Sequence, residues 1–171
     1  WKGKRVMLNF GAVDWKCEVW VNDIKVGTHT GGFTSFSMDV TAALKNKGEN
    51  VLTVCVWDPT DEGYQPRGKQ VKNPSGIWYT PVTGIWQTVW LEPVNDVHIA
   101  DVRILPNIDK HTVTVEAPNT AENKQSVVTS VKVFDAEGNV VATAATLGNS
   151  PIEIEMPADA RLWSPNDPYI Y

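Results

Sequence analysis

The sequence lacks the features that mark several large classes of protein. Its 171 residues contain two cysteines and three histidines, and no apolar run approaches the roughly 20 residues that a bilayer crossing requires. Basic residues are also too few to give a positive charge, because the formal net charge is −5. A chain of this charge lacks the positive field that supplies most affinity for nucleic acids and anionic membrane surfaces. We therefore expect neither nucleic acid nor a membrane as a partner.

The two cysteines do not show the dense, regular spacing of a disulfide framework. Cys17 and Cys55 each lie in an apolar strand-like run, and we expect both to be buried free thiols. The chain begins at Trp1, without a methionine or a signal segment, which suggests a trimmed chain. Targeting signals therefore do not identify the compartment, and we favour a periplasmic or extracellular location over a cytoplasmic one.

Alternating apolar residues are the main pattern in the first half of the chain. A period of two is typical of half-buried strands, and Asn22-Asp23 separates two such runs as a tight hairpin turn would. Thr41 is placed to cap a short helix that ends before Gly48. The apolar positions of the alternating runs are Val6, Leu8 and Phe10, then Val13, Trp15, Cys17, Val19 and Val21, then Leu52, Val54 and Val56.

Glu92-Pro93-Val94-Asn95-Asp96 follows an apolar strand at 85–91 and is typical of a hinge, because proline removes a hydrogen-bond donor of the ladder. We place a domain boundary here, giving domains 1–94 and 95–171. Beyond it, strand candidates recur at 99–108, 112–116, 127–134, 140–146 and 152–156, and a last one begins at Tyr169-Ile170-Tyr171. The prediction is an all-β fold with two β-sandwich domains, of which the second is immunoglobulin-like and incomplete.

The segment 58–75 is long for a loop inside a domain, and a function is therefore expected of it. Asp58, Asp61 and Glu62 could hold Ca²⁺, but their spacing lacks an EF-hand pattern, and we favour a solvated loop that pairs with Arg67 and Lys69. The histidines, His29, His98 and His111, are isolated in the sequence. We name no metal site, no cofactor and no catalytic residue.

The tryptophans point to a carbohydrate ligand. Sugars stack their apolar C–H faces on flat aromatic rings and need donors and acceptors for their hydroxyls. The segment 67–79 offers both kinds of group, with Arg67, Lys69 and Gln70 as donors and Trp78 and Tyr79 as platforms. Three other tryptophans lie in apolar strand phases and are expected in the core: Trp15, Trp86 and Trp90.

Several motifs in order along the chain resemble glycoside hydrolase family 2. They are Val19-Trp20-Val21-Asn22-Asp23, Val26-Gly27-Thr28-His29-Thr30-Gly31-Gly32-Phe33-Thr34, Asp39-Val40-Thr41, Arg67-Gly68-Lys69-Gln70, Gly76-Ile77-Trp78-Tyr79-Thr80-Pro81-Val82, Gly84-Ile85-Trp86-Gln87, Val89-Trp90-Leu91-Glu92, Leu162-Trp163-Ser164-Pro165 and Pro168-Tyr169-Ile170-Tyr171. The resemblance implies a sugar-binding jelly roll over 1–94, whose opening strand lies before Trp1, and an immunoglobulin-like domain over 95–171.

The resemblance further implies a parent enzyme that is a β-galactosidase, β-glucuronidase, β-mannosidase or relative. Its carbohydrate substrate would be cleaved by two carboxylates on a (β/α)₈ barrel after Tyr171 of the same polypeptide, as a monomer or a homo-oligomer. In the first two branches an acidic residue stands six positions before the glycine that Gly84 matches and contacts the sugar. Trp78 occupies that position here, so this contact does not carry over.

Two questions stay open at the level of sequence. Arg67, Lys69, Gln70 and Trp78 either form a rim of the parent's substrate site or pack the segment against the barrel for stability. The chain as a whole is either the non-catalytic front part of a glycosidase, which shapes the site and scaffolds the barrel, or a free-standing carbohydrate-binding module or cell-surface adhesive sandwich.

Overall fold

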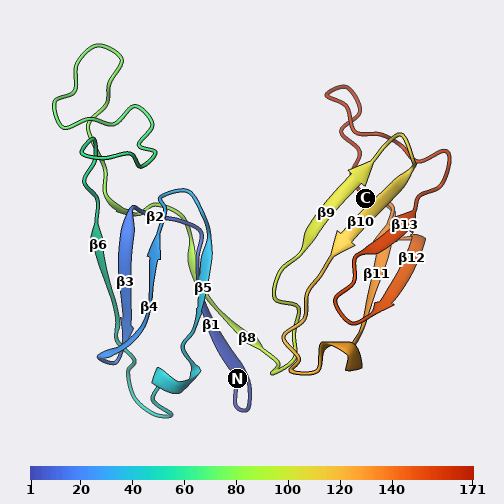
Figure 1. The fold of residues 1–171 in the computed structure, drawn as a ribbon, viewed down its shortest axis with the longest axis horizontal. Coiled ribbons are helices and arrows are strands. Elements are labelled where there is room, and N and C mark those ends of the chain that lie inside the picture. Colours follow the sequence, from blue (N-terminus) through green and yellow to red (C-terminus); the bar gives the residue numbers. More distant parts are fainter. The chain divides into compact units, whose positions relative to one another are not determined.

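The computed structural model describes all of residues 1–171, which form two compact units, Trp1–Asn95 and Asp96–Tyr171. Both units consist of antiparallel strands, and the helical structure is limited to two 3-10 turns, Thr41–Ala43 and Lys124–Ser126 (Figure 1). This confirms the predicted all-β class. None of the helical segments is long and apolar enough to cross a membrane.

The first unit contains two three-stranded sheets, ordered β5-β1-β8 and β4-β3-β6, and a short β2-β7 pair. β1 and β3 are the central strands of the two larger sheets, so each of them has hydrogen-bonded neighbours on both sides. The strands are β1 Arg5–Phe10, β2 Val13–Asp14, β3 Lys16–Val21, β4 Ile24–Thr30, β5 Phe36–Asp39, β6 Leu52–Trp57, β7 Gly84–Ile85 and β8 Val89–Val94.

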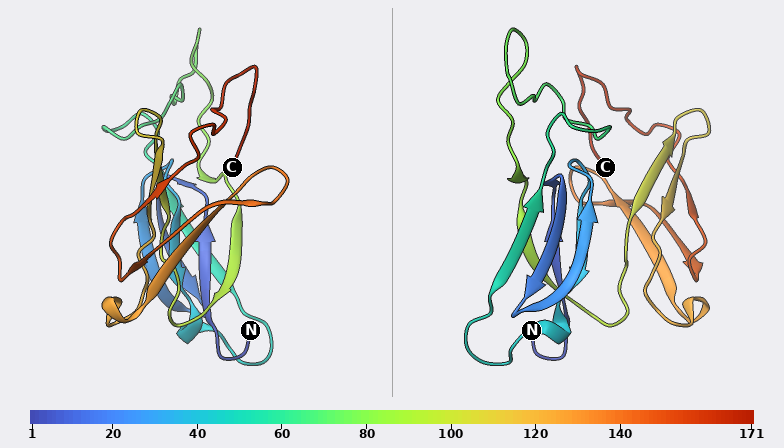
Figure 2. Two further views of the ribbon diagram at one scale, coloured as in Figure 1. Left: turned by 90° about the vertical axis from the view of Figure 1, so that its right-hand side faces the viewer. Right: turned by 60° about the vertical axis from the view of Figure 1, so that its left-hand side comes forward.

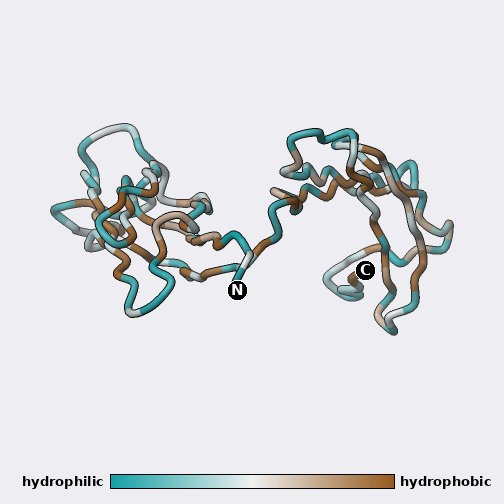
Figure 3. The backbone as a smooth tube through the Cα atoms, turned by 90° about the horizontal axis from the view of Figure 1, so that it is seen from below, coloured by the Kyte–Doolittle hydropathy of each residue, from teal (hydrophilic) through white to brown (hydrophobic).

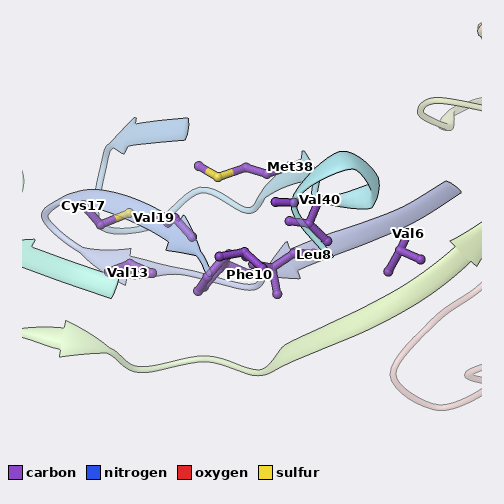
Figure 4. Close-up of a cluster of buried hydrophobic side chains, with 10 residues drawn as sticks. Val6, Leu8, Phe10, Val13, Cys17, Val19, Met38 and Val40 are labelled. Atoms are coloured by element: carbon purple, nitrogen blue, oxygen red, sulfur yellow. The ribbon is translucent and has the colours of Figure 1, made fainter. Parts of the chain in front are cut away.

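The core of this unit lies between the inward faces of β1 and β3. Most of the alternating apolar residues predicted for 6–21 are buried, whereas Val54 and Val56 are half-buried and Leu52 is exposed. The close-up in Figure 4 shows the buried side chains between the strands. Phe10 and Val19 are completely enclosed, at 0% exposure. The buried members from these two strands are Val6, Leu8 and Phe10 of β1, and Cys17, Val19 and Val21 of β3.

The predicted hairpin at Asn22-Asp23 is confirmed. Both residues adopt left-handed backbone angles, with φ of 49° and 68°, and Val21 pairs with Ile24 across the turn. The Asn22 side chain also accepts a hydrogen bond from the Val51 N–H at 3.0 Å and donates one to the Ala43 carbonyl at 2.8 Å. This turn therefore fastens the segment that leads into β6.

Asp14 is an acidic residue inside the first unit, at the end of β2, and is 8% exposed. Its burial, and secondarily the charge of Asp58, raise the pKa of the Asp14 carboxyl above its usual value. Gly32 lies directly against it, because a Cβ on Gly32 would stand 2.5 Å from Asp14 Oδ1. The Asp14 carboxyl group and the Gly32 backbone are therefore in close contact, and a side chain at position 32 would overlap the carboxyl group.

The second unit has a three-stranded sheet ordered β13-β10-β9 and a two-stranded sheet of β11 and β12. Val115, Ile152 and Ile154 of the three-stranded sheet and Ala117 just after β10 are buried, and apolar side chains of β11 and β12 pack against them. In Figure 3 the strands carry most of the hydrophobic colour and the turns are mainly hydrophilic. The strands are β9 Arg103–Asn107, β10 Thr112–Glu116, β11 Val128–Phe134, β12 Val140–Leu147 and β13 Ile152–Glu155.

Strand parity corrects two predictions about buried side chains. Cys17 is buried and Cys55 is exposed, although both are free thiols as predicted. Val54 and Val56 pack against the core, so Cys55 between them faces outward. Trp86 and Trp90 are 53% and 44% exposed and Trp15 is half-buried, so the prediction that these three tryptophans form the core is wrong.

Two predictions about secondary structure are also wrong. Thr41 caps no helix, because its hydroxyl accepts from the Val6 N–H and donates to Asp39, and only a single 3-10 turn forms there. The two units divide between Asn95 and Asp96, inside the predicted hinge, although residues 92–94 still belong to the edge strand β8, where Pro93 pairs with Val6. The segment 169–171 forms no strand, since no neighbouring strand pairs with it.

We predict that Asp14→Asn changes how stability depends on pH. A carboxyl whose folded pKa is raised contributes stability that is complete below its unfolded pKa and is lost as the pH rises through the folded pKa. The neutral Asn side chain avoids this loss, so the variant should melt above the wild type at pH 7, and its advantage should vanish toward about pH 3, below the usual Asp pKa. Melting curves at several pH values test this, and an advantage that stays constant across the range contradicts it.

We predict that Gly32→Ala destabilises the first unit by about 1–3 kcal/mol, the usual cost of overpacking. The new methyl group would overlap Asp14 Oδ1, so removing the carboxylate with Asp14→Ala should relieve part of that cost. Urea unfolding of the wild type, the two single variants and the double variant measures this coupling. The double variant should lose less unfolding free energy than the two single variants together. Additive losses would show that the new methyl group does not clash with Asp14.

Candidate functional site

The candidate site is the long connection 58–83 between β6 and β7. Figures 1 and 2 show this segment extending past the strand ends of the first unit. Its base is anchored where β7 pairs with β2, with Val13 opposite Ile85 and Asp14 opposite Gly84. We refer to residues 58–83 as the excursion, since they leave the sandwich after β6 and return to it at β7.

Backbone hydrogen bonds join the two arms of this excursion. Gln70 and Tyr79 form an isolated parallel bridge, in which the Tyr79 N–H donates to the Lys69 carbonyl at 2.8 Å. The Val71 N–H donates in turn to the Tyr79 carbonyl at 3.2 Å. This bridge brings the predicted donors of 67–70 beside the predicted platforms of 78–79.

The Gln70 side chain forms its hydrogen bonds within the excursion. Its Nε2 donates to the Arg67 carbonyl at 3.3 Å, and its Oε1 accepts from the Val82 N–H at 2.6 Å. The carboxamide thus links three points of the excursion. Its role in the site is to hold the arms together.

Arg67 and Trp78 form the most specific contact among the predicted site residues. The Arg67 Cζ lies 5.9 Å from the centroid of the Trp78 ring, within cation–π range. The Arg67 Nε is buried and has no hydrogen-bond partner. Lys69 is exposed, and Trp78 and Tyr79 are 40% and 65% exposed. The Lys69 ammonium and the two aromatic rings are thus available to a ligand, whereas the Arg67 Nε is enclosed.

The three acidic residues of the excursion have other partners than the predicted ones. Asp58 accepts from the Thr60 N–H at 2.7 Å and from the Thr83 hydroxyl at 2.9 Å. Glu62 forms an ion pair with Lys72, and Asp61 accepts from the Lys72 N–H at 3.4 Å. The expected pairing with Arg67 and Lys69 is therefore wrong, because Lys72 takes that place.

A cleft of about 260 Å³ lies at the base of the excursion. The Trp86 Nε1 donates to the Gly32 carbonyl at 2.7 Å, and the Phe33 ring meets the Trp86 ring edge-on at 5.9 Å between centroids. Sequence reasoning did not select Asp14 or Phe33, although an acid in an apolar strand run and the phenylalanine after Gly31-Gly32 were the available signals. The lining residues are Asp14, Phe33, Gln70, Val82, Thr83, Gly84, Ile85 and Trp86.

Aromatic and acidic groups meet in this cleft. Two exposed rings, Phe33 and Trp86, lie beside the buried Asp14 carboxyl, whose pKa is raised by burial and secondarily by the charge of Asp58. Asp58, which acts on Asp14 through its charge, has both carboxylate oxygens engaged by loop groups.

Two protein-family models match the chain. Residues 1–85 match the galactose-binding domain-like model of glycosyl hydrolase 2, and residues 97–171 match the glycosyl hydrolases family 2 model. The first unit is accordingly a galactose-binding-like jelly roll and the second an immunoglobulin-like sandwich. The matched ranges together include nearly the whole chain.

Individual relatives agree. A β-galactosidase of Thermoanaerobacter pseudethanolicus is 28% identical over 100% of this chain and 23% of its own length. A β-glucuronidase of Paenibacillus borealis is 27% identical over 100% of this chain and 30% of its own length. The structure of a β-glucuronidase from Ruminococcus gnavus in complex with D-glucuronic acid shares the fold, with a TM-score of 0.74 at 22% identity over 99% of this chain and 30% of that one.

The chain thus spans less than a third of the length of these relatives. Matches to both family models and to glycosidases along its entire length agree with the motifs seen in the sequence. The chain belongs to glycoside hydrolase family 2.

Proposed function

We propose that this chain is a non-catalytic part of a glycoside hydrolase that cleaves a terminal β-linked sugar. Its β6–β7 excursion would form a rim of the substrate site. The observation that carries the proposal is the contact of the Arg67 guanidinium with the exposed Trp78 ring. The ring would receive an apolar sugar face, and the exposed Lys69 beside it would donate to a sugar hydroxyl.

The carboxylates of the chain support a non-catalytic role. Glycoside hydrolysis requires two carboxyl groups facing the same bond, about 5–5.5 Å apart in retaining enzymes. Here the acids are mostly held in ion pairs or turns, for example Glu18 with Lys25, Glu62 with Lys72 and Asp167 with Arg161. Catalysis would then depend on a (β/α)₈ barrel in the same polypeptide.

A free-standing carbohydrate-binding module is the rival function. The names of the relatives favour the enzyme, since those matched along the whole chain are β-galactosidases and β-glucuronidases. Those proteins are also several times longer than this chain. The proposal includes a role of the rim in selecting the sugar that is cleaved.

We predict that Trp78→Ala in the full-length gene product raises KM for a nitrophenyl β-glycoside about tenfold, the equivalent of one lost ring contact. Arg67→Ala should act in the same direction, and Arg67→Lys should recover little, because lysine lacks the planar fork. Assays with the β-galactoside and the β-glucuronide measure the effect. Trp1→Ala is the control, since Trp1 is 65% exposed and lies at the opposite end of the unit (Figure 1). Unchanged kinetics for Trp78→Ala and Arg67→Ala would reject the rim.

We predict that the 171-residue chain on its own does not hydrolyse either nitrophenyl glycoside. The physical reason is that the neighbouring acids Asp14 and Asp58 are not available as a catalytic pair, because Asp14 is buried and both Asp58 oxygens accept hydrogen bonds from Thr60 and Thr83. Release of nitrophenol should stay at the buffer rate. Turnover of about 1 per second, at the low end of ordinary enzymes, would refute a non-catalytic role.

A further inference from the structure

Three aromatic side chains gather at a second place in the first unit. Trp15 stands between β2 and β3, Trp57 ends β6, and Tyr64 lies in the excursion that follows. The pairing of Lys16 with Trp57 brings the two tryptophans together, and their ring centroids are 5.9 Å apart at an interplanar angle of 58°. Trp57 is 57% exposed and Tyr64 is fully exposed. These rings add little to the core.

A hollow of about 560 Å³ lies among these rings, a volume within the range of small-molecule sites. Its walls combine the flat aromatic faces with polar groups from one short stretch of the excursion. Besides the three rings, the main lining residues are Pro59, Glu62 and Gln65. The hollow uses a different part of the excursion from the Arg67–Trp78 pair, because its lining residues from the excursion lie within 59–65.

The polar groups of this hollow are held in place. Gln65 Nε2 donates to the Thr60 carbonyl at 3.0 Å, which leaves the Gln65 Oε1 as an acceptor. A Cβ on Gly63 would stand 2.5 Å from that oxygen, and the Gly63 φ of 136° also disfavours any other residue. Lys72 holds Glu62 from outside the hollow through Glu62 Oε1. Two oxygen acceptors are thus kept at the edge of the rings.

The chemistry of the lining selects one kind of ligand. It contains no Lys, Arg or His, so an anionic ligand would find no charge partner and would face the Glu62 carboxylate. A purely apolar ligand would leave the Glu62 and Gln65 acceptors without donors. A pyranose ring offers an apolar face to the aromatic rings and hydroxyl donors to the two acceptors.

We propose that Trp15, Trp57 and Tyr64 form a second carbohydrate-binding site, which takes a neutral sugar unit of an oligosaccharide or polysaccharide. Glu62 and Gln65 accept hydrogen bonds from its hydroxyls. The site operates without bond cleavage, and its position on the jelly roll lets it hold a sugar while the rim contacts another. It is therefore independent of which glycoside the full-length protein cleaves.

The test titrates the 171-residue chain with neutral β-1,4-linked hexasaccharides of glucose, xylose and galactose, and with a galacturonate hexamer as the anionic counterpart. Tryptophan fluorescence and calorimetry should report binding of at least one neutral hexamer with a Kd of about 1 mM or lower, equivalent to about −4 kcal/mol. The galacturonate hexamer should bind at least about tenfold more weakly. Trp57→Ala should weaken neutral binding about tenfold, and Tyr64→Ala should weaken it several-fold.

Tyr64→Ala keeps the test decisive, because a fully exposed ring can be removed without loss of folding. Trp1→Ala is the matched control, with an exposed tryptophan outside the hollow. Failure of all three neutral hexamers to bind, binding unaffected by both variants, or stronger binding of the galacturonate hexamer would each overturn the proposal. The readout involves no hydrolysis, so its result is separable from the kinetic test of the rim.

Discussion

The alternation of side chains along the strands of the first unit determines which residues are exposed and can contact a ligand. β1 and β3 are the central strands of two facing sheets, so their alternate side chains must be apolar and the remaining ones must face outward. The same rule extends to β6 through its register with β3. Val54 and Val56 pack on the core, and Trp57 is consequently directed to the surface beside Trp15. The aromatic hollow is thus a consequence of the packing that stabilises the sandwich.

Two sets of contacts hold the excursion in place outside that core. At its base, the β2–β7 pair and the close contact of Asp14 with Gly32 determine where the chain leaves and returns. Farther out, the Gln70 carboxamide and the Tyr79 bridge join the arms, which frees the Arg67 side chain to lie over Trp78. Rigid backbone bonds and short polar links therefore replace a core in this segment. Such a loop can present exposed rings without folding back on them.

The sequence predicted the strands better than the surroundings of individual side chains. Period-two alternation identified β1, β3 and β6, because burial on one face of a sheet directly constrains composition. The same reasoning put Cys55 and Trp90 inside, since hydrophobicity alone does not tell which of two neighbouring apolar residues faces the core. Thr41 failed as a helix cap because its hydroxyl found long-range and local partners, Val6 and Asp39, that no local pattern reveals. Gln70 was predicted as a donor to a sugar, whereas its side chain forms hydrogen bonds with backbone groups of the loop itself.

The proposed non-catalytic role rests on the surroundings of two neighbouring acids. A catalytic pair of carboxyl groups needs both acids facing the same point with their proton affinities set apart. In this chain the buried Asp14 has its pKa raised by burial, while the neighbouring Asp58 is bound through both oxygens to Thr60 and Thr83. Asp14 is thus buried, and both oxygens of Asp58 accept hydrogen bonds within the loop. Exposed aromatic rings and fixed oxygen acceptors remain on the surface. In the proposed function these groups would hold a sugar in place while another part of the enzyme acts on it.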